Sequence, residues 1–143
     1  MSQLRLPFST LSSAAYQGLL DTNQALADSP LGQPLVELVY LRVSQINGCS
    51  FCLEMHAKAL RETGMAQRKL DCLAGWRVSE LFDARERAAL AWTEALTHVS
   101  TQDASDTLFE ALQGVFSAAE ISDLTFAVSL MNAFNRLAIG MRL

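Results

Sequence analysis

The chain has 143 residues, of which half are hydrophobic and 18% are charged, with only seven Gly and three Pro. This composition predicts one folded domain over residues 1–143 and excludes collagen-like repeats, long disordered tracts and low-complexity linkers. The formal net charge is −4, and Lys and Arg form no basic stripe. We therefore expect neither a nucleic acid nor an anionic membrane surface as a partner.

Helical periodicity runs along the chain, and the alternating patterns typical of strands are almost absent. Pro34 suits the first turn of a helix, Gly48 suits a helix end, and Ser117 with Glu120 has the form of a capping box. The expected helices cover residues 13–27, 34–46, 49–64, 66–73, 84–98 and 105–112, followed by a long helix after Ser117. The sequence thus predicts an all-α bundle of about six or seven helices.

Cysteine usage indicates the cellular compartment. Cys49, Cys52 and Cys72 are too few for a disulfide scaffold, and residues 1–11 lack the apolar stretch of a secretory signal. We therefore expect a cytoplasmic protein, with Cys72 as a small buried apolar residue. In a reducing compartment a close pair of cysteines is more often redox-active or metal-binding than structural.

Cys49, Cys52 and His56 lie on one face of the helix expected over residues 49–64. At about 100° per residue they span an arc of about 60°, and Cys52 and His56 have β-carbons roughly 5–6 Å apart. Backbone N–H groups of the first helical turn favour a thiolate, and an imidazole can take the thiol proton. A second thiol can capture a sulfenic acid as a disulfide. The segment therefore predicts a reactive cysteine, a base and a resolving cysteine.

Glu37 belongs to the same candidate site. Eight of the twelve residues from 35 to 46 are apolar, so this helix is mostly buried, and a carboxylate within it needs a partner. The next helix begins a few residues later, so an antiparallel arrangement makes His56 a suitable partner for Glu37. The carboxylate would hold the tautomer of the imidazole and raise its basicity. A structural pairing of Glu37 with Arg42 or Arg136 is the alternative.

Glu37, eleven intervening residues and then Cys49-x-x-Cys52-x-x-x-His56 resembles the signature of the AhpD-like alkylhydroperoxidases, within the carboxymuconolactone decarboxylase superfamily. Further similar segments are 76–79, 82–95 and 132–137. The resemblance extends from about residue 31 to the C-terminus. It departs at Phe51, where the best-known AhpD members have a second histidine.

The resemblance implies an all-α homo-oligomer, often a trimer or hexamer, that acts as a thiol peroxidase or disulfide oxidoreductase. We expect no cofactor and no metal. Cys52 would attack the hydroperoxide and become a sulfenic acid, and Cys49 would donate a proton and then form the disulfide. His56 and Glu37 would form the proton relay. A dithiol, either a lipoylated or a thioredoxin-like protein, would supply the electrons. Decarboxylation is not favoured, because the decarboxylase branch lacks the cysteine pair.

Three alternatives stay open at this level. Analogy with thioredoxin nominates Cys49, rather than Cys52, as the nucleophile. The pair could instead serve a redox-sensing or partner-binding module that changes oxidation state without rapid turnover. Cys49, Cys52, His56 and Glu37 could also supply four ligands to zinc, although structural zinc sites usually place Cys-x-x-Cys on a knuckle rather than within a helix.

Overall fold

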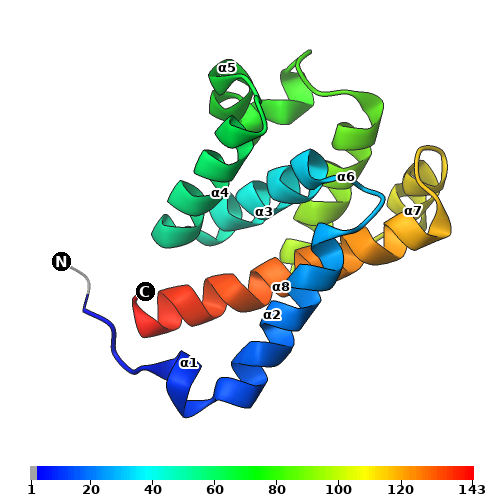
Figure 1. Cartoon of the computed structure of the whole chain (residues 1–143). Coiled ribbons are helices and arrows are strands. Elements are labelled where there is room, and N and C mark those ends of the chain that lie inside the picture. Colours follow the sequence, from blue (N-terminus) through cyan, green and yellow to red (C-terminus); the bar gives the residue numbers. More distant parts are fainter. Residues whose placement is uncertain (1–2) are drawn as a thin grey trace.

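A computed structural model describes residues 3–143, and every regular element in this range is helical (Figure 1). The elements are α1 (Phe8–Leu11), α2 (Ser13–Ala27), α3 (Gln33–Asn47), α4 (Ser50–Glu62), α5 (Gln67–Asp71), the 3-10 helix η1 (Leu73–Val78), α6 (Ala84–Thr97), α7 (Asp106–Gln113) and α8 (Ala118–Met141). The predicted all-α class is confirmed. No helix within residues 3–143 combines the length and apolar character needed to cross a membrane.

The expected helices are present, and the described residues contain two short ones that were not predicted. α1 has four residues, none of them buried, and its N-cap Pro7 makes no side-chain capping bond. η1 contains Gly75 in a non-helical conformation, which kinks the segment. Neither helix has the apolar periodicity or the capping residue from which longer helices are predicted.

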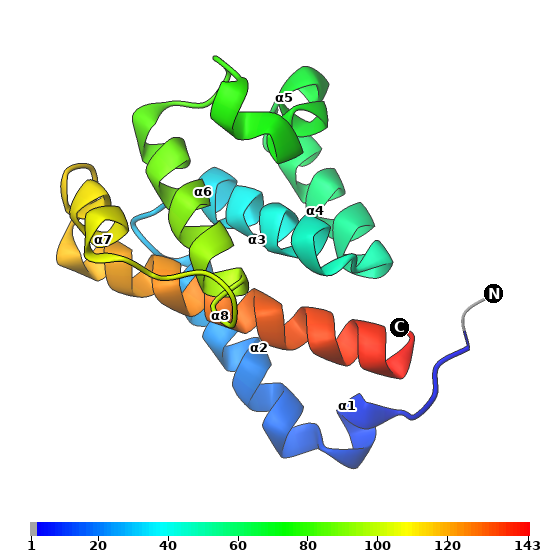
Figure 2. The same cartoon turned by 180° about the vertical axis from the view of Figure 1, so that it is seen from behind.

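α3 forms the centre of the fold. It contacts α4, α6 and α8, and α6 lies against both α3 and α8 in the view from behind (Figure 2). One side of α3 contributes Val39 and Val43 to the larger apolar cluster, and the other side contributes Leu38 and Leu41 to a second one. α2 differs, because Leu26 is its only buried residue. α3 therefore packs directly against α4, the helix that begins at the cysteine pair.

Glu94 on α6 joins three elements. Its carboxylate accepts hydrogen bonds from Arg42 Nε at 3.0 Å, Trp76 Nε1 at 2.7 Å and Arg77 Nη2 at 2.7 Å. Burial raises the pKa of this carboxyl, but the hydrogen bonds from Trp76, Arg77 and Arg42 outweigh burial and hold the pKa below its ordinary value. Arg42 is therefore paired with Glu94 and not with Glu37.

We expect Glu94→Gln to lower the free energy of unfolding by about 2–3 kcal/mol at pH 7, because two arginines lose their anionic partner. The folded-state pKa of Glu94 lies below its unfolded value of about 4.5, so the stabilisation is complete above that value. It is lost as the pH falls through the folded-state pKa. The difference in unfolding free energy between the wild type and Glu94→Gln, measured by urea unfolding, should therefore be larger at pH 7 than at pH 3.

Glu62→Gln is the matched control. Its carboxylate lies 3.9 Å from Lys58 on the exposed side of α4, where both side chains are mostly in solvent. We expect this variant to cost less than about 0.5 kcal/mol. Equal losses in the two variants would contradict the stabilising role of the Glu94 network.

Candidate active site

The turn between α3 and α4 positions the two cysteines. Gly48 ends α3 with φ +70°, a left-handed conformation that glycine adopts without a steric cost. Cys49 follows as the N-cap of α4, and its Sγ accepts the backbone N–H of Cys52 at 3.3 Å. Cys49 and Cys52 form a disulfide, with Cα atoms 5.3 Å apart. The cysteine pair is thus at the start of its helix, as the sequence predicts.

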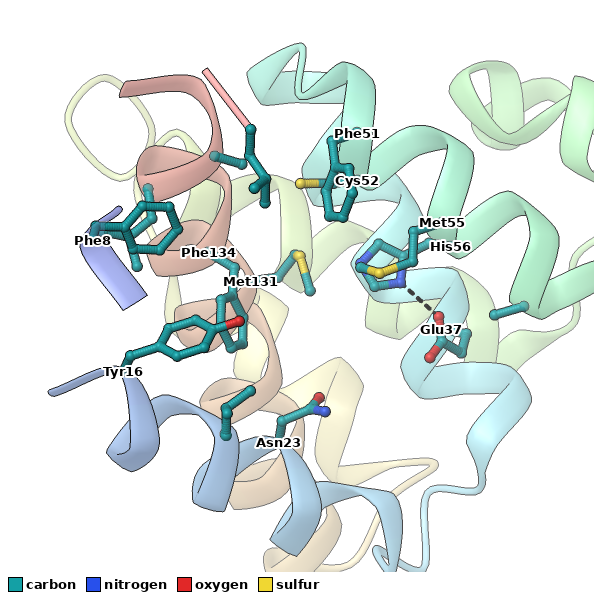
Figure 3. Close-up of a pocket in the computed structure, with 15 residues that line it drawn as sticks. Phe8, Tyr16, Asn23, Glu37, Phe51, Cys52, Met55, His56, Met131 and Phe134 are labelled. Carbon is teal, nitrogen blue, oxygen red and sulfur yellow. Dashed lines mark hydrogen bonds and ion pairs between the residues drawn. The ribbon is translucent and has the colours of Figure 1, made fainter. Parts of the chain in front are cut away.

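His56 and Glu37 are partners, as expected from the antiparallel arrangement of their helices. His56 Nδ1 lies 2.7 Å from Glu37 Oε2 (Figure 3). Because a carboxylate oxygen accepts, His56 donates from Nδ1, and in that tautomer of the neutral ring Nε2 is the nitrogen that can accept a proton. His56 is 4% exposed, and its buried Nε2 has no hydrogen-bond partner among the described residues. That nitrogen is available to a reduced thiol or to a ligand.

Tyr40 packs against this pair. Its ring centroid lies 5.2 Å from that of His56, and its side chain is buried. Burial raises the pKa of the Tyr40 phenol far above its ordinary value, and the nearby charge of Glu37 raises it further. Tyr40 therefore stays neutral, and its hydroxyl donates a long bond of 3.5 Å to Asn23 Oδ1 on α2.

A cavity of about 320 Å³ lies beside the cysteine and the histidine (Figure 3). Cys52 and His56 line it, whereas Cys49 does not. The remaining lining residues are Phe8, Tyr16, Leu20, Asn23, Glu37, Phe51, Met55, Ala59, Met131, Phe134, Leu137, Ala138 and Leu143. Cys52 is therefore the sulfur of the pair that faces the cavity.

Sequence reasoning did not identify the wall contributed by the N-terminal helices. Phe8 lies on α1, while Tyr16, Leu20 and Asn23 lie on α2. The apolar side of α2 was visible as a helical pattern, but the pattern does not show what that side packs against.

The expectation that Cys72 is buried was wrong. Its side chain is partly exposed at the C-cap of α5, a helix of only five residues.

The four candidate residues are bonded to one another in pairs. The two sulfurs form the disulfide, and His56 bonds Glu37. Within residues 3–143, no three His, Cys, Asp or Glu side chains are grouped as ligands for a metal ion. The described arrangement is a disulfide whose Cys52 lines a cavity together with His56, and a Glu37 carboxylate bonded to that histidine.

Known proteins are similar to this chain in sequence and in fold. The sequence model of the carboxymuconolactone decarboxylase family matches residues 13–95. The uncharacterised protein YdfG of Bacillus subtilis is 28% identical over 141 residues, covering 99% of this chain and 95% of YdfG.

Two solved structures superpose well. ATU0492 from Agrobacterium tumefaciens, of unknown function but proposed to be the antioxidant defence protein AhpD, has a TM-score of 0.92. It is 34% identical, and the alignment covers 98% of this chain and 96% of ATU0492. An uncharacterised peroxidase-related protein from Silicibacter has a TM-score of 0.79 at 25% identity, covering 89% of this chain and 68% of that protein.

Proposed function

Because the chain belongs to the carboxymuconolactone decarboxylase family, as an AhpD-like member, we propose that it is a thiol-dependent peroxidase that reduces hydroperoxides through Cys52. One observation carries the proposal. Cys52 and the unpartnered Nε2 of His56 belong to side chains that line the same cavity, and Glu37 bonds the other nitrogen of the imidazole. This arrangement suits removal of a thiol proton and its later delivery to a leaving group.

In the reduced protein, His56 Nε2 accepts the proton of the Cys52 thiol, and the Glu37 carboxylate stabilises the imidazolium. The thiolate attacks the outer oxygen of the hydroperoxide, so a sulfur–oxygen bond forms as the oxygen–oxygen bond breaks. The departing alkoxide takes the proton from His56 and leaves as an alcohol. Cys52 is then a sulfenic acid.

Cys49 completes the oxidative half of the cycle. Its sulfur attacks the sulfenic sulfur of Cys52, water leaves, and the disulfide present in this structure results. A dithiol donor, such as a lipoylated or thioredoxin-like protein, reduces the disulfide by two exchange steps. The sum is one hydroperoxide and one dithiol converted to one alcohol, one water and one disulfide.

The test is turnover of cumene hydroperoxide by the reduced protein with excess dihydrolipoamide. We expect consumption of many equivalents per chain, at a rate proportional to protein concentration. Cys72→Ser is the matched control and should keep this rate, because Cys72 does not line the cavity. Loss of hydroperoxide no faster than with dihydrolipoamide alone would contradict the proposal. Oxidation of one equivalent without further turnover would instead support the redox-sensing alternative.

A further inference from the structure

The wall of the cavity opposite Cys52 is aromatic and is held in place by the N-terminal segment. Phe8 packs edge-to-face on Tyr16 with centroids 5.8 Å apart, and Tyr16 packs in the same way on Phe134 at 6.4 Å. Arg5 anchors this segment to the end of α8, since its N–H donates to Met141 O at 2.8 Å and its guanidinium donates to Gly140 O at 3.1 Å. α1, α2 and α8 therefore form one continuous wall (Figure 3).

The mouth of the cavity is also apolar. Phe51 and Met55 on α4 are each 45% exposed while they line the cavity, and Leu20 on α2 is exposed beside it. A ligand that enters between these side chains gains by removing their apolar surface from water. A ligand without apolar surface gains nothing there and loses hydrogen bonds to water.

The charge of the lining disfavours anions. The described residues that line the cavity include no Lys or Arg. They include one acidic residue, Glu37. The chain as a whole carries a formal net charge of −4. A carboxylate inside the cavity would lose its hydration without meeting a lysine or an arginine, and it would lie near the carboxylate of Glu37.

The size of the cavity limits the ligand. Its volume of about 320 Å³ is at the low end of the roughly 300–1,000 Å³ that is typical of ligand pockets. We propose that this cavity selects neutral hydroperoxides with a compact apolar group of phenylalkyl size, an inference that rests on the proposed peroxidase function. It rejects hydrogen peroxide, which is too polar, and fatty-acid hydroperoxides, which carry a carboxylate.

The first test compares kcat/KM for cumene hydroperoxide, hydrogen peroxide and the hydroperoxide of linoleic acid. We expect cumene hydroperoxide to be preferred over each of the others by about 100-fold. Values within about threefold of one another, or a preference for either of the other two, would overturn the inference while the peroxidase function stood.

Two variants test the aromatic wall and the charge at the mouth of the cavity. Phe134→Ala should lower kcat/KM for cumene hydroperoxide by about 10–100-fold and leave that for hydrogen peroxide within about twofold. Phe126→Ala removes an exposed aromatic of the same helix that does not line the cavity, and it should change neither value. Equal losses for both peroxides in Phe134→Ala would overturn a selective role of the wall.

Leu20→Lys is the second variant, and it replaces an exposed side chain, so the packing of the buried core is not changed. Leu20 is exposed at the mouth of the cavity, so a lysine at this position can keep its ammonium group in water. We expect kcat/KM for linoleic acid hydroperoxide to rise by about tenfold relative to that for cumene hydroperoxide. An unchanged ratio would overturn the argument from charge.

A binding experiment separates failure of this inference from failure of the proposed function. Nuclear magnetic resonance titration of the oxidised protein uses 2-phenylpropan-2-ol and decanoate, neither of which reacts. We expect the alcohol to change the chemical shifts of residues that line the cavity, and decanoate to change none of them. If no hydroperoxide is turned over but the alcohol still binds there, the peroxidase proposal fails and the selectivity of the cavity stands. Binding of decanoate alone would overturn the selectivity.

Discussion

We expect Cys52→Ser to abolish hydroperoxide reduction, with kcat/KM lowered on the order of 10⁴–10⁶-fold. Cys52 is the sulfur that lines the cavity, and a serine hydroxyl there can neither be oxidised by a peroxide nor form the disulfide. The measurement is the loss of cumene hydroperoxide with excess dihydrolipoamide. A variant that retains the wild-type rate would contradict the assignment of Cys52 as the nucleophile.

Cys49→Ser is the informative counterpart, because it removes only the resolving sulfur. This variant should consume one equivalent of hydroperoxide at close to the wild-type rate and then stop. Mass spectrometry after that equivalent should locate the added oxygen on Cys52. If Cys52→Ser were instead oxidised rapidly on Cys49, the thioredoxin-like order of attack would be correct.

The second large effect is expected at the proton relay. His56→Ala should lower the rate constant for the first oxidation step by about 10²–10⁴-fold, because the thiol loses its base and the alkoxide loses its proton donor. Stopped-flow oxidation of the reduced protein measures this step separately from disulfide reduction. His98→Ala is the matched control, since His98 lies at the C-cap of α6 and does not line the cavity.

Glu37→Gln should fall between the wild type and His56→Ala. The amide oxygen of glutamine can still accept the Nδ1 proton of His56, so the ring keeps its orientation. The negative charge that stabilises an imidazolium is lost, however. Wild-type rates in both His56→Ala and Glu37→Gln would show that the pair plays no part in the chemistry.

Local patterns were sufficient to predict most of the helices and the contacts of the candidate site. Ser117 and Glu120 form the predicted capping box at the start of α8, and Gly48 ends α3. The pairing of Glu37 with His56 could be predicted because a short turn joins two consecutive helices, which restricts how they pack. Spacing within one helix was enough to bring Cys52 and His56 to the same face.

The contacts that were missed join residues far apart in the chain. The edge-to-face packing of Tyr16 on Phe134 links α2 to α8, and Arg42 on α3 meets Glu94 on α6. Helical periodicity shows that one face is apolar or that a charge needs a partner, but it does not identify the partner. The same limit left open which cysteine faces the cavity, because that depends on where α8 and the N-terminal helices pack.

The most direct test of the account is the pH dependence of alkylation of Cys52 by iodoacetamide, measured in the reduced Cys49→Ser variant with and without His56→Ala. With His56 present, we expect the midpoint of the rate profile to lie below the ~8.5 of an ordinary thiol. With His56 replaced, the midpoint should move upward, because the thiolate loses its imidazolium partner. Superimposable profiles would contradict the coupling of Cys52 to His56 on which the proposed mechanism depends.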